Sequence, residues 1–274
     1  MAPVYPIDLD IDFTALMALE SHGPDVYVGI SPDYPWGRVY GGQVVAQGLR
    51  AAAATVDEDR HVHSLHAYFI RGGTSSEPIR YEVDRIRNGR SFTTRRVVAR
   101  QSEGAILNLS CSFQVVEDQV DVQESMAPGD MGSAEDGANE DWGMLGHRRA
   151  IQEPGHSASW LRILSDLGND RVLHDCALAF LSDDLPSNAS VSSHPQVVDM
   201  GMDREERHQS FMGASLDHAI WFHRHAPADQ WQLHDFRSHG LTGGRGLSSG
   251  EVFSLDGIHV ASVAQEFLFR ELTR

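Results

Sequence analysis

The chain carries two copies of one pattern, and this duplication constrains its fold more than any other feature. Residues 64–71 (SLHAYFIR) are echoed by 215–224 (SLDHAIWFHR). At nearly the same separation, 88–94 (NGRSFTT) is echoed by 243–249 (GGRGLSS). Two echoes in register predict that one succession of structural elements occurs twice. Each half of the 274 residues is close to the commonest size of a domain and can bury a core of its own.

Each half reads as one largely apolar helix followed by four strands. The helices are expected at 41–54, which is rich in alanine, and at 171–181. The expected strands are rich in β-branched and aromatic residues and lie at 61–71, 78–87, 92–100 and 106–116, then at 209–224, 231–238, 246–255 and 258–269. This order predicts an α+β fold in which each half is an antiparallel sheet wrapped around a central helix. Two such units can join edge to edge or pack helix against helix.

The charge distribution predicts how the halves are connected. Acidic residues are concentrated in 117–141, which holds nine of them, no Arg and no periodicity. We therefore expect an exposed acidic linker at 121–138, between an N-terminal domain at 1–120 and a C-terminal domain at 139–274. The net charge of −17 disfavours nucleic-acid binding, because a phosphate backbone requires a basic surface.

All 22 basic residues are Arg. The absence of Lys excludes Schiff-base chemistry and the lysine of phosphate-binding loops. Six of the Arg lie between Arg85 and Arg100. They are interpreted either as an anion site or as an outward strand face paired with carboxylates.

The compartment can also be predicted. No apolar run approaches the ~20 residues that span a bilayer, so membrane insertion is not expected. The acidic start at residues 1–10 lacks the basic and apolar parts of a secretory signal. The chain has two cysteines, Cys111 and Cys176, each in an apolar segment. A cytoplasmic protein with reduced core cysteines is expected.

Two features suggest other chemistry but lack the context for it. Gly246–Gly250 matches the G-x-S-x-G pattern of a hydrolase nucleophile, yet that pattern requires a helix after the Ser, and here a strand continues. The chain has 15 histidines but no H-E-x-x-H or C-x-x-C pattern, so no metal site is expected. His218 and His223 are predicted to be structural or to lie at a domain contact.

A candidate site emerges where the two copies differ. The second helix ends in Asp183, where the first carries only Ala and Thr, and the last strand carries Gln265 where the first copy has Ser112. Together with Ser215 on an earlier strand, these side chains can converge on one water, because a carboxylate takes a proton from water that a hydroxyl and an amide hold in line. The alternative is a solvated helix end and an ordinary strand pair.

At these residues the sequence resembles the type II acyl-CoA thioesterase family (TesB-like), whose members carry two tandem hot-dog domains in one chain. The resemblance lies in 40–47 (YGGQVVAQ), 63–69 (HSLHAYF), 87–92 (RNGRSF), 214–223 (ASLDHAIWFH) and 263–266 (VAQE). It implies hydrolysis of fatty acyl-CoA to free fatty acid and CoA within fatty acid metabolism. Acyl-CoA would be the binding partner, and no cofactor is implied.

The resemblance also implies roles for residues. Matching its motifs carries the family's water-binding Asp, Ser or Thr, and Gln onto Asp183, Ser215 and Gln265, with the C-terminal domain carrying the catalytic residues. A shift of one residue would make Asp184 the base instead.

Substrate contacts are expected in the first half. A backbone N–H at the start of a helix, such as that of Gly42, would polarise the thioester carbonyl. Arg90 and its neighbour Ser91 would meet the CoA phosphates.

Other functions and assemblies remain open. A non-catalytic acyl-CoA-binding module would need the pocket but not Asp183. A double hot-dog enoyl-CoA hydratase would need an Asp and a His placed together, whereas the adjacent Asp217 and His218 point to opposite faces of a strand. Open sheet edges favour a homo-oligomer, either a dimer or a tetramer of double hot-dog subunits, although duplication already supplies one partner within the chain.

Overall fold

The computed structural model describes residues 11–129, 131–202 and 204–272, so the acidic start at 1–10 lies outside the described residues. Its helices are α1 (Phe13–Leu16), α2 (Gly41–Ala53), α3 (Arg171–Leu181), α4 (Pro186–Val191), α5 (Pro195–Met200) and α6 (Arg204–Ser210). Its strands are β1 (Glu20–Ser21), β2 (Val26–Gly29), β3 (Arg60–Phe69), β4 (Ile79–Asn88), β5 (Phe92–Gln101), β6 (Gly104–Val115), β7 (Ala138–Asn139), β8 (Leu145–Glu153), β9 (His156–Ile163), β10 (Phe211–Ser215), β11 (Asp217–Phe222), β12 (Gln232–Thr242), β13 (Arg245–Ser254) and β14 (His259–Glu271). Across these ranges, no helix combines the length and the apolar character needed to cross a bilayer.

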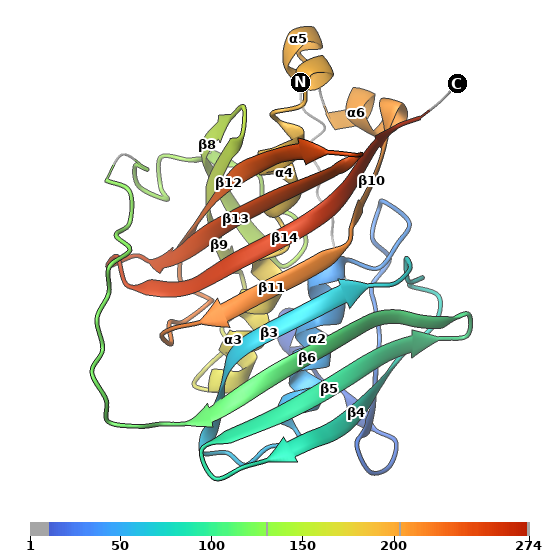
Figure 1. The fold of residues 1–274 in the computed structure, drawn as a ribbon, viewed down its shortest axis with the longest axis vertical. Helices are drawn as coiled ribbons and strands as arrows, with labels where there is room; N and C mark the ends of the chain where they lie inside the picture. Colours follow the sequence, from blue (N-terminus) through green and yellow to red (C-terminus); the bar gives the residue numbers. More distant parts are fainter. Residues whose placement is uncertain (1–10, 130, 203, 273–274) are drawn as a thin grey trace.

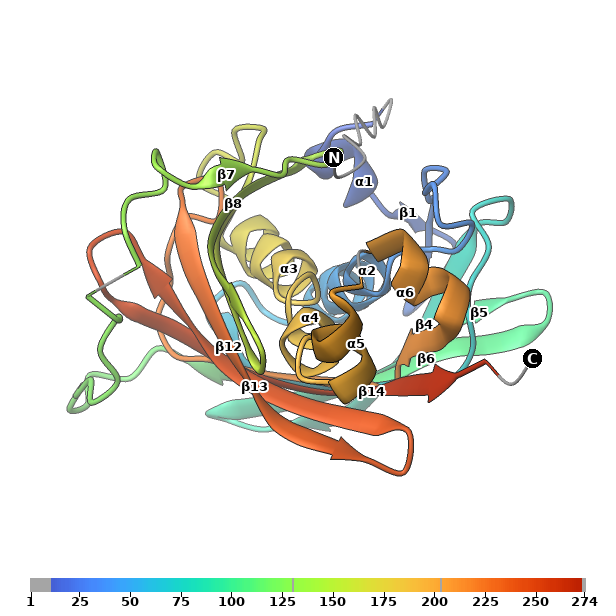
Figure 2. The same cartoon turned by 90° about the horizontal axis from the view of Figure 1, so that it is seen from above.

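One 14-stranded sheet runs through the molecule in the order β1-β2-β4-β5-β6-β3-β11-β14-β13-β12-β9-β8-β7, with β10 paired to β14 beside this path (Figure 1). The two halves join edge to edge where β3 pairs antiparallel with β11. On the inner, concave face of the sheet, α2 and α3 pack side by side (Figure 2). The predicted α+β fold of two tandem hot-dog units is confirmed, and the units join through both their edges and their helices.

The central helix of the first half is buried on almost every side. Its alanines and valines let the sheet approach closely, and Val45 and Leu49 lie in the main core. Two buried amides on this helix are satisfied, because Tyr34 donates to Gln43 Oε1 at 2.8 Å and Tyr81 donates to Gln47 Oε1 at 2.6 Å. The helix therefore carries polar groups into the core without leaving them unbonded.

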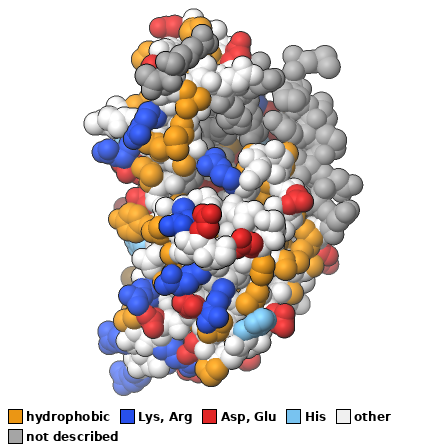
Figure 3. All heavy atoms as spheres, turned by 90° about the vertical axis from the view of Figure 1, so that its right-hand side faces the viewer, with side chains coloured by type: hydrophobic (Ala, Val, Ile, Leu, Met, Phe, Trp, Pro, Cys, Tyr) orange, Lys and Arg blue, Asp and Glu red, His pale blue; other side chains and the backbone are white. Residues whose placement is uncertain are grey.

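The Arg-rich segment of the first half is largely an outward strand face. Arg85 pairs with Asp25 at 2.8 Å, Arg100 with Glu82 at 3.0 Å, and Arg96 with Asp84. Figure 3 shows Arg and acidic side chains interspersed on the side of the molecule that faces right in Figure 1. An exception is Arg95, which is buried and donates to Thr55, Asn88 and main-chain carbonyl groups.

The second half departs from the predicted order in three ways, one of which is that the short helices α4, α5 and α6 lie between α3 and the next strand. A hairpin, β8–β9, precedes α3 and extends the sheet, so the half does not begin with its helix. The strand predicted at 209–224 is also wrong as a single element. Residues 209–210 end α6, and Leu216 separates β10 from β11, because its N–H bonds to Glu266 while its carbonyl oxygen accepts from Phe69 in the other half.

The echo between 64–71 and 215–224 aligns His66 with His218, but the two side chains face opposite ways. His218 lies opposite Ala67 across the β3–β11 register and is fully buried, whereas His66 lies opposite Ala219 and is exposed. Strand side chains alternate between faces, so the repeat is out of phase by one residue here.

The composition of the acidic linker predicted an exposed segment, but part of the linker packs against the second half. Residues 117–129 run past the ends of β11 and of the β13–β14 hairpin (Figure 1), and Gln123 bonds to the main chain of Gly257 and His259. Further on, Met131 and Ala134 are buried in a small core on the outer face of the sheet, with Trp160, Leu233 and Phe253. These apolar contacts explain why a charged segment is held against the domain.

The G-x-S-x-G match lies entirely on a strand, β13, as its flanking residues predicted. Ser248 is buried and donates to the carbonyl oxygen of Pro186 at 2.7 Å. The last glycine of the match, Gly250, is required for space: a Cβ there would lie 2.3 Å from the carbonyl oxygen of Asp235 and 2.6 Å from the Phe236 ring.

We expect Gly250→Ala to lower the free energy of unfolding by about 1–3 kcal/mol, because backbone and a buried ring must move to admit the methyl group. Gly213→Ala is the matched control on β10, since the nearest atom to its Cβ would be the Leu268 carbonyl oxygen at 3.8 Å. Its effect should stay within about 0.5 kcal/mol. Denaturant unfolding of both variants checks this, and equal losses would contradict the packing argument.

Candidate functional site

The end of α3 rests on the beginning of α2, and this contact places Asp183. Tyr40 donates from its hydroxyl to the carbonyl oxygen of Phe180 at 3.0 Å. A Cβ on Gly42 would lie 2.5 Å from that same oxygen, and a Cβ on Gly41 would lie 2.7 Å from Asp183 Oδ2. Only glycines at these two positions let the Asp183 carboxylate settle onto the N-terminus of α2, where helix N–H groups favour a negative charge.

Asp183 has the electrostatic character of a base. Burial raises its pKa from 3.8 to about 7, hydrogen bonds from the Gln265 side chain and the Gly42 backbone N–H oppose that rise, and the charge of Asp184 adds to it. Oδ1 of Asp183 is buried, and none of the described residues forms a hydrogen bond with it. This oxygen is therefore a free acceptor inside the protein.

The other two predicted water-binding residues meet next to Asp183. Gln265 lies on β14 and is 1% exposed. Ser215 ends β10 opposite Phe267, two residues along from Gln265 and on the same face of the sheet. The Gln265 amide donates from Nε2 to Ser215 Oγ at 2.9 Å and also hydrogen-bonds Asp183. Gln265 thus links the other two side chains.

Sequence reasoning missed His218 as a member of this network. Its Nδ1 lies 2.5 Å from Gln265 Oε1 and its Nε2 lies 2.9 Å from Ser182 Oγ. Burial lowers the pKa of His218 to about 4, although the bond to Gln265 opposes the shift. The alternation on β11 contains a usable signal, because His218 shares the inner face with buried Ile220 and thus stands where an apolar residue is expected.

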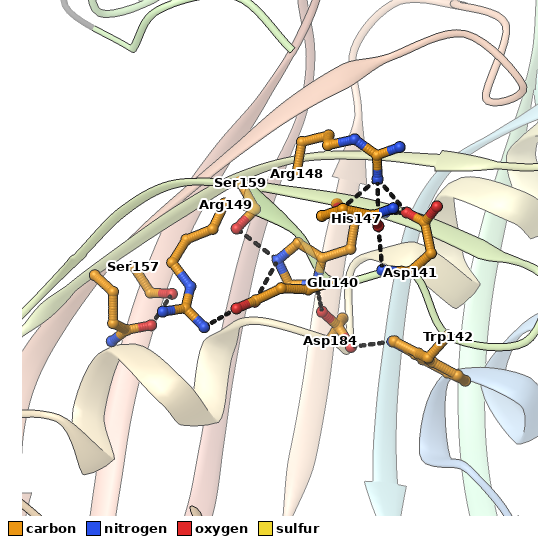
Figure 4. Close-up of polar contacts among 11 residues, drawn as sticks. Glu140, Asp141, Trp142, His147, Arg148, Arg149, Ser157, Ser159 and Asp184 are labelled. Carbon is orange, nitrogen blue, oxygen red and sulfur yellow. Dashed lines mark hydrogen bonds and ion pairs between the residues drawn. The ribbon is translucent and has the colours of Figure 1, made fainter. Parts of the chain in front are cut away.

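Asp184 belongs to a different group of side chains (Figure 4). Its Oδ1 accepts from Trp142 Nε1 at 3.1 Å, and its Oδ2 lies 3.4 Å from His147 Nδ1. His147 in turn contacts Ser159 Oγ at 2.8 Å through Nε2. Both oxygens of Asp184 are therefore engaged, in contrast to the free Oδ1 of Asp183.

Of the predicted substrate contacts, Gly42 lies next to Asp183, whereas Arg90 and Ser91 do not. Gly42 touches the site, but its N–H binds the Asp183 carboxylate. Arg90 and Ser91 lie in the turn between β4 and β5, beyond the C-terminal end of α2, where Arg95 bonds to both Thr55 and Asn88. A helix of 13 residues separates them from Gly42 by about 20 Å. Among the described residues there is no group of three or more His, Cys, Asp or Glu that could hold a metal ion.

Two family models match this chain. Residues 30–114 match the acyl-CoA thioesterase N-terminal domain and residues 116–269 match the acyl-CoA thioesterase C-terminal domain. Acyl-CoA thioesterase 2 of Haemophilus influenzae is 32% identical over 93% of this chain and 96% of its own length. Human acyl-coenzyme A thioesterase 8 is 30% identical over 94% of this chain and 88% of its own.

Solved structures show the same relationship. The acyl-CoA thioesterase II TesB2 from Mycobacterium marinum is 34% identical, covers 95% of this chain and 99% of its own, and superposes with a TM-score of 0.83. A tesB protein from Mycobacterium avium subspecies paratuberculosis is 30% identical with a TM-score of 0.81, over 94% of this chain and 98% of its own. Both family models match, and the relatives align over nearly their whole length. The chain therefore belongs to the acyl-CoA thioesterase family of thioester hydrolases.

Proposed function

We propose that the protein hydrolyses fatty acyl-CoA to free fatty acid and CoA by direct attack of water, with Asp183 as the general base. The observation that carries this proposal is the Asp183 carboxylate, which is buried, has a pKa near 7 and keeps one oxygen without a hydrogen bond from any described residue. A general base works best when its pKa lies near the working pH. The names of the relatives support acyl-CoA as the substrate.

In this mechanism the attacking water donates one hydrogen to Asp183 Oδ1 and the other to Ser215 Oγ. Gln265 positions the two groups that accept from the water, since its amide hydrogen-bonds Asp183 and donates to Ser215 Oγ at 2.9 Å. The water oxygen then presents a lone pair to the thioester carbon. Because the Gly42 N–H is used by Asp183, we assign polarisation of the carbonyl oxygen to the Ser215 hydroxyl hydrogen, which the Gln265 bond leaves free.

The thioester is cleaved in two steps, addition of water and loss of the thiolate. Water oxygen bonds to the carbonyl carbon while Asp183 takes its proton, and the tetrahedral intermediate then breaks its carbon–sulfur bond. A thiol with a pKa of about 8.5 leaves readily as thiolate, and the proton held by Asp183 passes to that sulfur or to solvent. Neither an acyl-enzyme nor a cofactor is needed.

Further features belong to the same proposal. Arg90 and Ser91 would have to meet CoA phosphates at the far end of α2 or from another subunit of a dimer or tetramer. The domain limits of 1–120, 121–138 and 139–274 remain proposed boundaries, with the catalytic side chains on the C-terminal domain. Cys111 and Cys176 are buried free thiols, which fits a reducing cytoplasm and a role in fatty acid metabolism there.

Asp183→Asn should lower kcat by at least about 100-fold, because the base is lost while shape is kept. Asp184→Asn is the matched control and should stay within about 3-fold of the parent, since Asn can still accept from Trp142. Thiol release from a short, a medium and a long acyl-CoA measures both. Loss of activity in Asp184→Asn alone would move the base by one residue. Binding without any release would indicate the binding module.

The rate should depend on pH through Asp183. We expect kcat/KM to rise about tenfold per pH unit below pH 7 and to level off above it, because Asp183 must be ionised to accept a proton and its pKa is raised to about 7. In Asp184→Asn this acid limb should move to lower pH, since a neighbouring negative charge is removed. An acid limb near pH 4 in the parent would contradict the assignment.

The ionised Asp183 carboxylate should destabilise the folded protein at high pH. Its folded pKa of about 7 lies above the unfolded value near 3.8, so the stability it contributes is present below pH 3.8 and is lost as pH rises to about 7. Asp183→Asn should therefore raise the free energy of unfolding by up to about 4 kcal/mol at pH 8 and by less than half of that at pH 5. Denaturant unfolding at both values tests this, and a variant less stable than the parent at pH 8 would disprove it.

A further inference from the structure

The Gln265 side chain must face one particular way for the site to work. Its amide nitrogen serves Asp183 and Ser215, and its amide oxygen is turned to the opposite side, 2.5 Å from His218 Nδ1. A glutamine amide is nearly symmetric in shape, so packing alone does not choose between its two orientations. The flipped orientation would point the amide oxygen at a carboxylate and a hydroxyl oxygen, which would repel the first and leave the second without its donor.

The contacts of His218 favour the same orientation from the opposite side of the amide. Gln265 Oε1 can only accept, so Nδ1 of His218 carries the hydrogen of that bond. A neutral imidazole has a single N–H, so Nε2 is an acceptor. The Ser182 hydroxyl lies 2.9 Å from Nε2 and 3.1 Å from the carbonyl oxygen of Ala179. We assign its one hydrogen to Nε2, because with hydrogen on Nδ1 this buried ring nitrogen has no other donor. His218 is fully buried, and burial lowers its pKa to about 4, so it stays neutral at neutral pH. A flipped Gln265 would set its amide hydrogens against this N–H.

We infer that His218 is a positioning residue of the reaction: its neutral Nδ1–H tautomer, fixed by Ser182, locks the Gln265 amide so that its nitrogen faces Asp183 and Ser215. The inference rests on the proposed function, in which Gln265 orders the base and the hydroxyl. His218 itself does not touch the water or the substrate in this account. It acts through Gln265 alone.

Core packing alone does not require a histidine at position 218. On the inner face of the first half, the neighbouring β3–β6 pair is Leu65 and Cys111, which are both buried and apolar. A strand pair at this depth thus packs without a histidine. In contrast, the second fully buried histidine, His234 on β12, has no hydrogen-bond partner on either ring nitrogen among the described residues. It provides a matched control for removing a buried imidazole.

The test compares kcat for His218→Leu, His218→Asn and His234→Leu on acyl-CoA. We expect His218→Leu to lower kcat by roughly 10- to 100-fold with little change in KM, as for other residues that orient a reacting group. His218→Asn should recover most of that loss, because its amide nitrogen takes the place of Nδ1–H. His234→Leu should match the parent. Thermal unfolding of each variant shows that it is folded.

A double-mutant cycle with Gln265→Ala tests whether His218 acts through Gln265. In the Gln265→Ala background, His218→Leu should change kcat by less than about 2-fold, because there is no amide left to orient. A full additional loss in that background, or no difference between the Asn and Leu variants, would overturn the inference. Both outcomes leave the thioesterase proposal standing if the parent releases thiol and Asp183→Asn does not.

A measurement without substrate covers the case in which the parent releases no thiol. Nitrogen-15 NMR of labelled imidazoles at neutral pH should show His218 as the neutral Nδ1–H tautomer, with its resonances changed in Gln265→Ala and Ser182→Ala. A protonated ring, or a neutral ring with hydrogen on Nε2, would overturn the assignment of His218 whatever the activity.

Discussion

The arrangement of the site depends on the contact between the C-terminal end of α3 and the N-terminus of α2. Two glycines, Gly41 and Gly42, leave room for the Phe180 carbonyl and the Asp183 carboxylate to approach within distances that any side chain would block. The helix terminus favours the negative charge, while burial disfavours it. The balance leaves Asp183 with a pKa of about 7, between that of an exposed carboxylate and that of a permanently neutral one.

Duplication of the fold makes this contact possible within one chain. The two halves share a continuous sheet through the β3–β11 pair, so each central helix lies beside the other on the same face. The halves have then diverged at the join. The first contributes a helix N-terminus and an apolar strand pair, whereas the second contributes an acid, a hydroxyl, an amide and a histidine. The site therefore belongs to the interface between the halves.

Much of this could be predicted from the sequence, since strand and helix periodicities are local. The ranges of α2, α3, the four strands after α2 and the last three strands of the chain follow from their composition. Asp183, Ser215 and Gln265 were also expected to converge. The β8–β9 hairpin was missed because its Arg, His and Gln residues obscure the alternation. His218 was missed because a repeat matched by residue type was one residue out of phase, which changes the face of a strand but not the look of the sequence. The burial of Met131 and Ala134 depends on long-range packing that composition does not report.

The central claim is that Asp183 activates water and is not itself the nucleophile. The most direct test is a single turnover of acyl-CoA in ¹⁸O-labelled water with enzyme in excess, followed by mass analysis of the fatty acid and of the peptide that contains Asp183. The account predicts one ¹⁸O in the released fatty acid, none in Asp183 and no acylated protein at any time. An ¹⁸O atom in Asp183, or an acyl group on the protein, would contradict it.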